Sequence, residues 1–337
     1  MSASPRDKRR PATIYDVARM AGVSHQTVAR FLRGEGVREH TRTQVEAALV
    51  ALNYRPNQQA KALATNRSYR IGAFVHAQAQ WALLAIMDGA AAEARRAGYV
   101  LDLVSVDPED PASVSQAVEI MAESSLAGAV VLAASDSMLQ VLDASQVSCP
   151  VIVERSARKN PGRQPEPDFA IGVEHLVDLG HRRFFHIAGP LDWPASRARR
   201  KALHAVAQEH GGEVVAEAEG DWSAQGGYQA MAAAFDSRLG ATAIVCANDH
   251  MALGALNWLA GAGLRVPQDV SVLGFDDLPD GAYYLPPLTT VSVDNSAFGR
   301  NIIQRLFRQL GVRTRTVSMR GELVVRGTTG PVPARAR

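Results

Sequence analysis

The sequence predicts an α/β protein in which an N-terminal all-α helix-turn-helix headpiece precedes a two-lobed core of doubly wound parallel sheets. Short apolar periods of helical type fill the first part of the chain. Runs typical of strands and helices then alternate in two successive series. The length of 337 residues is too great for one comfortable core and suits two or three domains.

The composition is that of a soluble globular protein, with 47% apolar and 21% charged residues. No apolar run reaches the roughly eighteen residues that a membrane helix needs, and the N-terminus lacks the apolar centre of a secretory signal. We therefore expect a cytoplasmic protein without a membrane partner. Cys149 and Cys246 are far apart and lack metal-ligand spacing, so we expect no disulfide framework, no metal and no cofactor.

Charge is unevenly distributed along the chain. Residues 1–70 contain 13 Lys and Arg against 5 Asp and Glu, a net charge of +8, and the rest contains 23 against 29, a net charge of −6. A basic segment attracts DNA because neutralised phosphates release their counterions. The headpiece is therefore a candidate nucleic-acid binder, with a solvated basic tail as the alternative.

The headpiece is predicted to contain three short helices. Thr13 is expected to cap the first helix, Gly22 to supply the turn and Ser24 to cap the second helix. The third helix, within HTRTQVEAALVALNY, is expected to begin with Thr41 as its cap. The residues expected to face a common small core are Ile14, Val17, Ala18, Ala21, Val28, Phe31, Leu32, Val45, Ala48, Leu49 and Leu52.

In such a module the second helix enters the major groove and its first residues reach base edges. This places His25 and Gln26 among the expected reading residues, with Arg30 one turn later. Gln bonds adenine in bidentate fashion, His donates to guanine or phosphate, and Arg does either. The alternative is that all three are ordinary exposed helix residues.

The run TIYDVARMAGVSHQTVARFLRG resembles the headpiece of the lac repressor family of bacterial transcription regulators. GVEHLVDLGHRR, EGDWSA, ANDHMALGA, SVLGFDD and YYLPPLTTV resemble segments of the same family's core, so the resemblance spans roughly residues 12–328. It implies a DNA-binding headpiece (12–56), a hinge helix (57–69) and a periplasmic-binding-protein-like effector core (70–330). Within the core it implies an N-lobe of about 70–167 and 294–321 and a C-lobe of about 168–293 and 322–330. The implied DNA contacts are Thr13, Tyr15, Ser24, His25, Gln26, Thr27, Arg30, Asn57, Ala62 and Leu63.

The segment RPNQQAKALATNRS has only one large apolar residue in its middle, Leu63, to stabilise a helix. Pro56 ends the preceding helix and Asn57 is a possible cap, but so short a helix is marginal alone. The resemblance implies a hinge that folds on DNA and, paired with its copy in a dimer, wedges Leu63 into the minor groove. A simple linker is the alternative.

The core shows a βαβ rhythm that predicts two similar lobes. Sheets of this kind bind ligands beyond the C-terminal ends of their strands. Strands are expected at 69–75, 99–106, 126–134, 149–154, 182–189, 242–248 and 270–277, and helices at 82–98, 114–124, 170–180, 196–211 and 250–263.

Polar residues follow several of these strands, among them Glu154, Asn248 and Asp276, and carboxylate and amide groups suit the hydroxyls of a sugar. The resemblance implies that Arg199, Asn248 and Asp276 bind those hydroxyls and that Trp222 stacks on the sugar. Each residue taken alone could also be a strand-end cap or a solvated residue. The full set of expected effector-binding residues is His76, Glu154, Arg199, Trp222, Asn248 and Asp276.

Departures from the family pattern show that part of this pocket is remodelled. His76 and Leu132 stand at strand ends, Trp193 and Pro194 enter a loop usually built from small polar residues, and Glu154 aligns only loosely. We expect a pyranose or small glycoside as effector, and a purine or other small metabolite remains open.

The expected function is a sequence-specific repressor of carbohydrate-use genes that a sugar inducer releases from operator DNA, with a corepressor-dependent regulator as the alternative. The chain ends without a leucine heptad, so we expect a homodimer that reads a near-palindromic operator. A transport solute-binding protein would carry an export signal. A glycosidase is disfavoured because the adjacent residues Asp276 and Asp277 point to opposite faces of a strand.

Overall fold

The computed structural model describes residues 12–32, 34–54, 68–76, 81–107, 110–132, 136, 139–140, 147–153 and 167–333. The predictions for Asn57, Ala62, Leu63 and Glu154, and for the side chain of His76, lie outside the described part of the chain. The chain divides into two compact units, Met1–Ser68 and Tyr69–Arg337. No helix among the described residues is long and apolar enough to cross a membrane.

Local capping signals form the first unit. Its described helices are α1 (Ile14–Ala21), α2 (His25–Leu32) and α3 (Glu39–Ala51). The Thr13 hydroxyl accepts the Asp16 N–H at 3.3 Å while the Asp16 carboxylate accepts the Thr13 N–H at 2.9 Å, which makes a capping box. Gly22 ends α1 at φ 64°, and the Ser24 hydroxyl accepts the Thr27 N–H at 3.1 Å. The predicted caps at Thr13, Gly22 and Ser24 are confirmed.

The core of this unit is small. Val17, Val28 and Val45 are fully buried, one from each helix. Two predictions are wrong. The third helix begins at Glu39 rather than at a Thr41 cap, because the Glu39 carboxylate favours the positive helix N-terminus and no capping side chain is used. Leu32 is 37% exposed rather than inward, since it is the last residue of α2 at the edge of the core.

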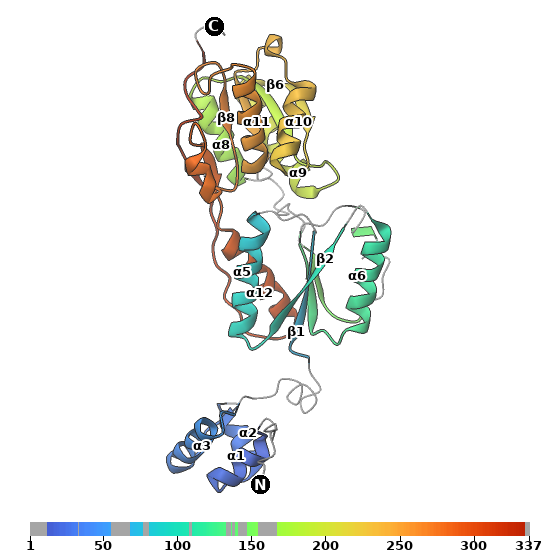
Figure 1. Cartoon of the computed structure of the whole chain (residues 1–337), viewed down its shortest axis with the longest axis vertical. Coiled ribbons are helices and arrows are strands. Elements are labelled where there is room, and N and C mark those ends of the chain that lie inside the picture. Colours follow the sequence, from blue (N-terminus) through green and yellow to red (C-terminus); the bar gives the residue numbers. More distant parts are fainter. Residues whose placement is uncertain are drawn as a thin grey trace, which may run out of the picture. The chain divides into compact units, whose positions relative to one another are not determined.

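The first lobe of the core contains a parallel sheet with helices on both faces. Among the described residues the strand order is β2-β1-β3-β4. Successive side chains of β1 point to opposite faces of the sheet, so Ile71 and Ala73 pack with α5 and α12, and Phe74 packs with α6. Figure 1 shows α5 and α12 on one face of this sheet and α6 on the other. The elements are β1 (Arg70–His76), α5 (Trp81–Arg96), β2 (Val100–Val106), α6 (Pro111–Glu123), β3 (Gly128–Val131), β4 (Val151–Val153) and α12 (Asn295–Gln309).

Helices α5 and α12 lie side by side although about 200 residues separate them in the chain (Figure 1). Two glycines make this close approach possible. A Cβ atom on Gly299 would lie 2.8 Å from the Ile86 carbonyl carbon, and a Cβ atom on Gly89 would lie 2.8 Å from the Ser296 Cα. The helix returning from the far end of the sequence therefore completes the first lobe.

The second lobe repeats this plan. Its sheet has the order β6-β5-β7-β8, parallel throughout the described strands. Phe184 faces α8 and α9, and Phe185 faces α10 and α11. The elements are α8 (Pro167–Asp178), β5 (Arg183–Ala188), α9 (Pro194–Glu209), β6 (Glu213–Glu219), α10 (Ala224–Ala234), η1 (Ser237–Leu239), β7 (Ala243–Cys246), α11 (Asp249–Gly261), β8 (Ser271–Leu273) and η2 (Pro279–Tyr283).

The same strand order in both sheets confirms the predicted pair of similar lobes. An antiparallel pair, β9 (Thr290–Ser292) and β10 (Glu322–Val324), packs Val291 and Leu323 against the second lobe. Strand β6 and helices α10 and α12 were not predicted from the sequence. Between β9 and β10 the chain forms α12, so segments from both ends of the core sequence complete the first lobe.

Candidate DNA-binding and effector sites

Helix α2 presents the predicted reading residues at the surface. His25, Gln26 and Arg30 are all exposed, as the sequence indicates. The exposed ring of Tyr15 on α1 lies 5.1 Å from the ring of His25, centroid to centroid, so the two helices form one aromatic surface at the start of α2. Such a surface can contact a sugar or base edge while Gln26 offers its amide to a base.

Several of the predicted DNA contacts also hold the headpiece together. Thr13 and Ser24 are engaged in their caps, and the Thr27 hydroxyl lies 2.9 Å from that of Ser24. Backbone and side-chain groups at such helix starts are common phosphate contacts. A structural role and a DNA contact are therefore compatible at these positions.

Arg30 is engaged by the loop that follows its helix. Its Nη2 donates to the Gly36 carbonyl at 3.0 Å, and its Nε lies 3.4 Å from the Glu35 carboxylate. Glu35 is a residue that sequence reasoning missed, because the contact depends on how the loop folds back onto α2. DNA phosphate would have to compete with Glu35 for the Arg30 guanidinium.

In the second lobe, the structure brings together Arg199, Trp222 and Asp276. Arg199 extends from α9, and its Nη2 lies 3.9 Å from the Asp276 carboxylate beyond β8. Its guanidinium carbon is 5.5 Å from the centroid of the Trp222 ring and 4.2 Å from that of Phe275. Both ring distances are within the range of cation–π interactions. The Arg199 guanidinium therefore lies between two aromatic rings and the Asp276 carboxylate.

Asp276 has both a raised pKa and a strained backbone. Burial raises the pKa of Asp276 to about 6, although the nearby Arg199 opposes the rise. Asp276 also has φ 108°, a conformation that non-glycine residues rarely adopt, and its N–H is held by the Val291 carbonyl at 3.0 Å. Strained residues and perturbed acids cluster at functional sites, so Asp276 is a candidate ligand contact.

Two donors at this site are buried without a hydrogen-bond acceptor among the described residues: Arg199 Nε and Trp222 Nε1. The other guanidinium donors are partly used, since Arg199 Nη1 donates to the Ala247 carbonyl. Buried N–H groups normally find an acceptor, so this end of the lobe can satisfy oxygen atoms of a ligand.

Asn248 has a structural role here. Its Oδ1 accepts the Met251 N–H at 2.9 Å and so caps α11, and its Nδ2 donates to the Trp222 carbonyl at 2.9 Å. Trp222 itself is buried and at φ 71°. The strand-end cap that the sequence left open is thus observed, and Asn248 positions Trp222 beside Arg199.

Two further acids near β8 are bound by protein groups. The buried Asp249 accepts the Thr290 hydroxyl at 2.6 Å and the Leu278 N–H at 2.8 Å, and burial raises its pKa to about 7. Asp277 accepts from Arg326 at 2.6 Å. These carboxylates fasten the loop after β8 to β9 and to the C-terminal segment.

The comparisons with known proteins agree with this architecture. Residues 13–57 match the family of bacterial regulatory proteins called lacI, and residues 173–329 match a periplasmic binding protein-like domain. The lactose operon repressor of Escherichia coli (strain K12) is 34% identical over 305 residues, which cover 89% of this chain and 85% of that protein. The chain belongs to the lacI family.

Other relatives and solved structures also align with most of the chain. The transcriptional repressor PurR of Haemophilus influenzae (strain PittEE) is 30% identical over 89% of this chain and 91% of its own length. A crystal structure of the lac repressor dimer bound to operator and the anti-inducer ONPF has a TM-score of 0.74 at 32% identity, over 95% of this chain and all of that chain. A CelR–cellobiose complex has a TM-score of 0.66 at 26% identity, over 94% and 99%.

Membership of the lacI family makes the chain a DNA-binding transcriptional repressor and not an enzyme. This resolves the two rival interpretations, the transport protein and the glycosidase. The binding of Asp277 by Arg326 fits this result, because Asp277 is committed to the fold rather than paired with Asp276 across a scissile bond.

The second lobe also contains site features that were not predicted from the sequence. Trp193 is buried and packs edge-on against Trp222, with ring centroids 5.9 Å apart. The tryptophan that replaces a small polar residue in this loop therefore forms an aromatic pair with Trp222. Phe275 under Arg199 was missed too, although its place directly before Asp276 in a strand end was a usable signal.

Proposed function

We propose that this lacI-family repressor binds operator DNA as a homodimer and that a sugar or small glycoside bound between the two lobes of the core releases it. The observation that carries the effector assignment is the largely buried pair of Arg199 and Asp276, whose side chains are 16% and 10% exposed. A guanidinium donates and a carboxylate accepts, and a hydroxyl group can satisfy both at once. The cellobiose complex of one structural relative and the ONPG complex of another support a carbohydrate ligand.

A purine effector has support of a different kind, because PurR relatives are 30% identical to this chain. The geometry favours the sugar. Arg199 and Asp276 offer donors and an acceptor suited to hydroxyl groups, whereas Trp222 is 5% exposed and covered by Arg199 and Trp193, so stacking on its face contributes little for either ligand. In our proposal Arg199 and Asp276 bind hydroxyls, Trp222 bounds the site, and Asn248, His76 and Glu154 complete the effector set.

For DNA, we propose that Gln26 and His25 read base edges and that Arg30 contacts a base or phosphate after leaving Glu35. The Tyr15 ring packs beside His25. The start of α2 is positioned on the DNA phosphate backbone by Thr13, Ser24 and Thr27. Asn57, Ala62 and Leu63 are proposed to form the minor-groove hinge. Because the target is bacterial operator DNA, we place the protein in the cytoplasm.

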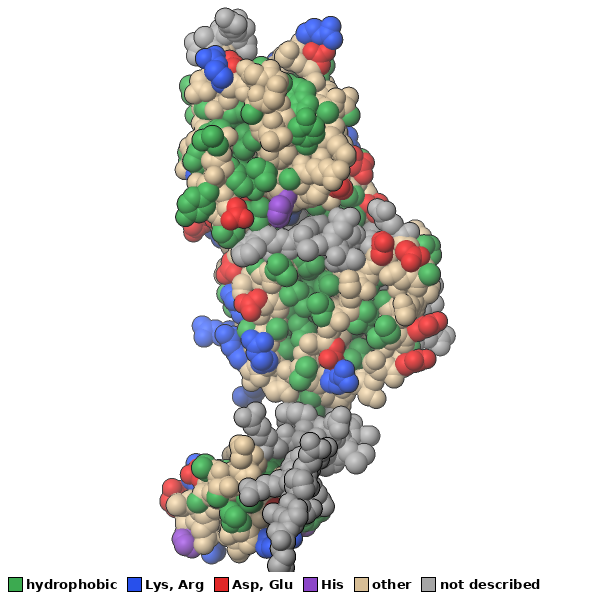
Figure 2. All heavy atoms as spheres, in the orientation of Figure 1, with side chains coloured by type: hydrophobic (Ala, Val, Ile, Leu, Met, Phe, Trp, Pro, Cys, Tyr) green, Lys and Arg blue, Asp and Glu red, His purple; other side chains and the backbone are tan. Residues whose placement is uncertain are grey.

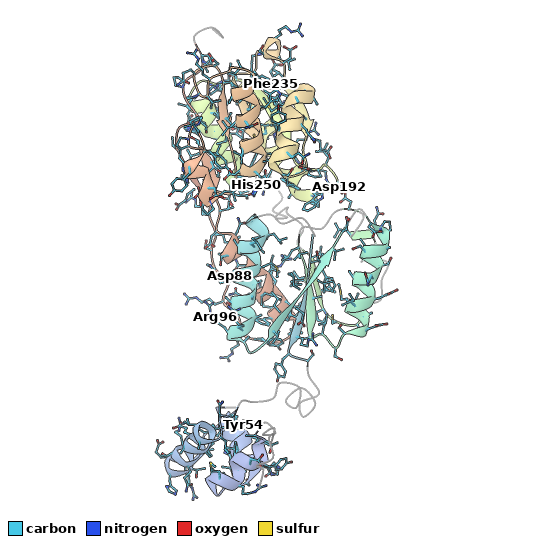
Figure 3. All side chains as sticks on the ribbon, in the orientation of Figure 1. Tyr54, Asp88, Arg96, Asp192, Phe235 and His250 are labelled. Atoms are coloured by element: carbon cyan, nitrogen blue, oxygen red, sulfur yellow. The ribbon has the colours of Figure 1, made fainter. Side chains whose placement is uncertain are left out.

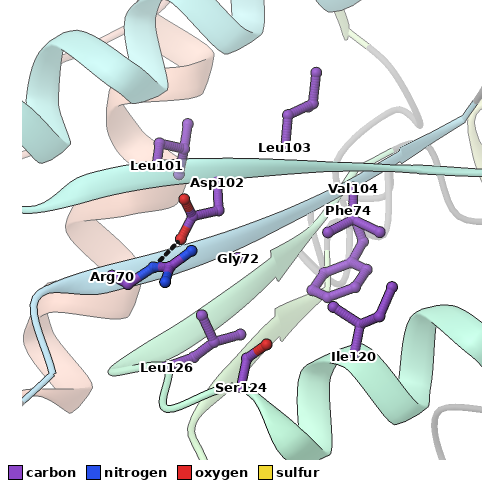
Figure 4. A pocket seen from close by; sticks show the side chains of 10 residues that line it. All are labelled: Arg70, Gly72, Phe74, Leu101, Asp102, Leu103, Val104, Ile120, Ser124 and Leu126. Carbon is purple, nitrogen blue, oxygen red and sulfur yellow. Dashed lines mark hydrogen bonds and ion pairs between the residues drawn. The ribbon is translucent and has the colours of Figure 1, made fainter.

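The homodimer is supported by an apolar surface on the first lobe. Leu84 on α5 and Val100 and Leu103 on β2 are each at least half exposed. Hydrophobic side chains gather over the elements that carry them (Figure 2). A groove of about 400 Å³ lies beside β2, lined by Phe74, Ile120 and other residues around the Arg70–Asp102 ion pair (Figure 4). Exposed apolar side chains of this kind mark interaction sites, and a second copy is the partner we propose.

The DNA assignment is tested by binding-site selection from a random duplex library. Gln26→Ala should relax base preference at one operator position in each half-site, because one bidentate base contact is lost. Gln44→Ala is the matched control, since Gln44 is an exposed glutamine on α3. Unchanged selectivity of Gln26→Ala would count against the reading role.

The effector assignment is tested by a thermal-shift panel of sugars, glycosides and purines on the full chain. A sugar hit should disappear in Asp276→Asn and in Arg199→Met, and persist in Asp236→Asn, which breaks an exposed Asp–Arg pair elsewhere in the second lobe. The hit should then lower operator affinity in a mobility-shift assay. A purine hit, or tighter operator binding, would contradict the proposed sugar inducer.

A further inference from the structure

The start of α9 is joined to the first lobe by a charged contact. Asp136 follows β3 of the first lobe in the sequence, and Arg197 lies in the first turn of α9 in the second lobe. Arg197 Nη1 donates to Asp136 Oδ2 at 2.8 Å and Nη2 donates to Asp136 Oδ1 at 3.0 Å. Paired N–H donors on both carboxylate oxygens give the contact a fixed direction as well as strength.

Two further hydrogen bonds fix the same place. The Asp136 N–H donates to the carbonyl of Asp192, which Figure 3 labels in the loop before α9, at 3.1 Å. Arg197 Nη1 also donates to the Leu191 carbonyl at 2.7 Å. The loop before α9, the helix and the first lobe are thus tied together at one point.

Helix α9 connects this point to the candidate effector site. Arg199 lies two residues after Arg197 in the same helix and contacts Asp276 and Trp222. Further along, Arg200 and His204 both bind Glu217 of β6, so the helix is fastened to its own sheet. Because a helix moves as a rigid body, a ligand that shifts Arg199 also shifts Arg197.

We propose that the Arg197–Asp136 ion pair, which we call the clasp, holds the two lobes in the arrangement seen here. Effector binding regulates DNA affinity by strengthening or breaking this ion pair. This inference rests on the proposed function, because it assigns the regulation of the same site. Both side chains are almost half exposed. Exposed ion pairs are weak and are screened by salt. The clasp therefore shifts a near-balanced equilibrium between two lobe arrangements and does not fix the lobes in one of them.

The first experiment measures the distance between lobes without DNA or effector. Spin labels are attached to cysteines at Glu119 on α6 and Gln229 on α10, both exposed, in full-length protein with Cys149→Ser. Cys246 is fully buried and stays unlabelled. Arg197→Ala and Asp136→Ala should each broaden or shift the distance distribution. The exchange of both charges, Arg197→Asp with Asp136→Arg, should restore it.

Arg200→Ala is the matched control, because Arg200 is as exposed as Arg197 but binds Glu217 within the second lobe. It should leave the distribution unchanged. A wild-type distribution in Arg197→Ala, or an equal change in Arg200→Ala, would overturn the clasp. Since neither DNA nor a sugar is present, failure here is separate from failure of the effector panel.

The second experiment measures affinity for the selected operator duplex at low and high salt. Loss of the clasp should change affinity about 5-fold, the low end of typical allosteric coupling. The change should be in the same direction for Arg197→Ala and Asp136→Ala, and the double variant should match either single one. The change should fade at high salt. Additive effects of the two substitutions would overturn the proposal.

Discussion

Gly299→Ala should destabilise the first lobe through the crossing of α5 and α12. The new Cβ would lie 2.8 Å from the Ile86 carbonyl carbon and 2.9 Å from the Ala90 nitrogen, where ordinary contact begins at 3.4 Å. These are backbone atoms of α5, which cannot rotate away as a side chain can. The Ile86 carbonyl oxygen would be closer still, so the helices must separate by more than half an ångström, and Ile302, Ile303 and Phe307 must withdraw from the core with α12.

Two opposing contributions determine how far Gly299→Ala changes the free energy of unfolding. Overpacking a close contact costs about 1–3 kcal/mol. Replacing glycine by alanine inside a helix returns up to about 1 kcal/mol, because the unfolded chain loses freedom. Because the clash is with backbone atoms, we take the upper end of the cost and expect a net decrease of about 2 kcal/mol in the free energy of unfolding of the first lobe.

The measurement is urea unfolding by circular dichroism, with hydrogen exchange of the α5 and α12 amides to locate the loss. Gly261→Ala is the matched control, because Gly261 is the last residue of α11 and its Cβ would meet open space. That variant should be as stable as the parent or slightly more stable. If Gly299→Ala unfolds at the parent's urea concentration, the close-approach argument is refuted.

Three further predictions concern caps and charges. Thr13→Ala should remove the capping box and destabilise the headpiece by about 1 kcal/mol, measured by thermal unfolding, and Thr13→Ser should keep most of it. Glu35→Gln should free Arg30 and raise affinity for non-operator DNA, with about one more counterion released in the salt dependence. Asp249 keeps its proton to about pH 7 in the native state but only to about pH 4 unfolded, so the free energy of unfolding should fall as pH rises through that interval. Calorimetry at several pH values should show this slope flattened in Asp249→Asn.

Features that local chemistry determines were predictable from the sequence. The caps at Thr13 and Ser24 and the left-handed Gly22 follow from side-chain and backbone preferences over three or four residues. The Thr41 prediction was wrong because a capping residue is a preference, and a helix can begin earlier when an acid occupies its first turn. The alternation of strands and helices was equally local, so the two lobes followed from it.

Long-range pairings were not predictable in this way. Helix α12 packs closely on α5 because Gly89 and Gly299 each lie against the backbone of the other helix, and no local signal links positions so far apart. The contact of Arg30 with Glu35 depends on the path of a loop. At the candidate site, the residue types were predicted, but the structure was needed to show that Asn248 caps α11 and that Trp193 covers Trp222.

The sequence SRARR shows how one short helical segment can link functions that are spatially separate. Residues 197, 199 and 200 lie at different angles around α9, so their guanidinium groups reach Asp136 of the first lobe, Asp276 near β8 and Glu217 of β6. The Glu217 contacts fasten α9 to its sheet, so the turn that carries Arg197 and Arg199 moves with the helix and the sheet as one body. A ligand that replaces Arg199's protein contacts with its own oxygens changes the force balance on that turn, and the nearest contact that can yield is the exposed one to Asp136. Coupling between effector and lobe arrangement therefore requires no long chain of residues, because both contacts belong to the same turn of helix.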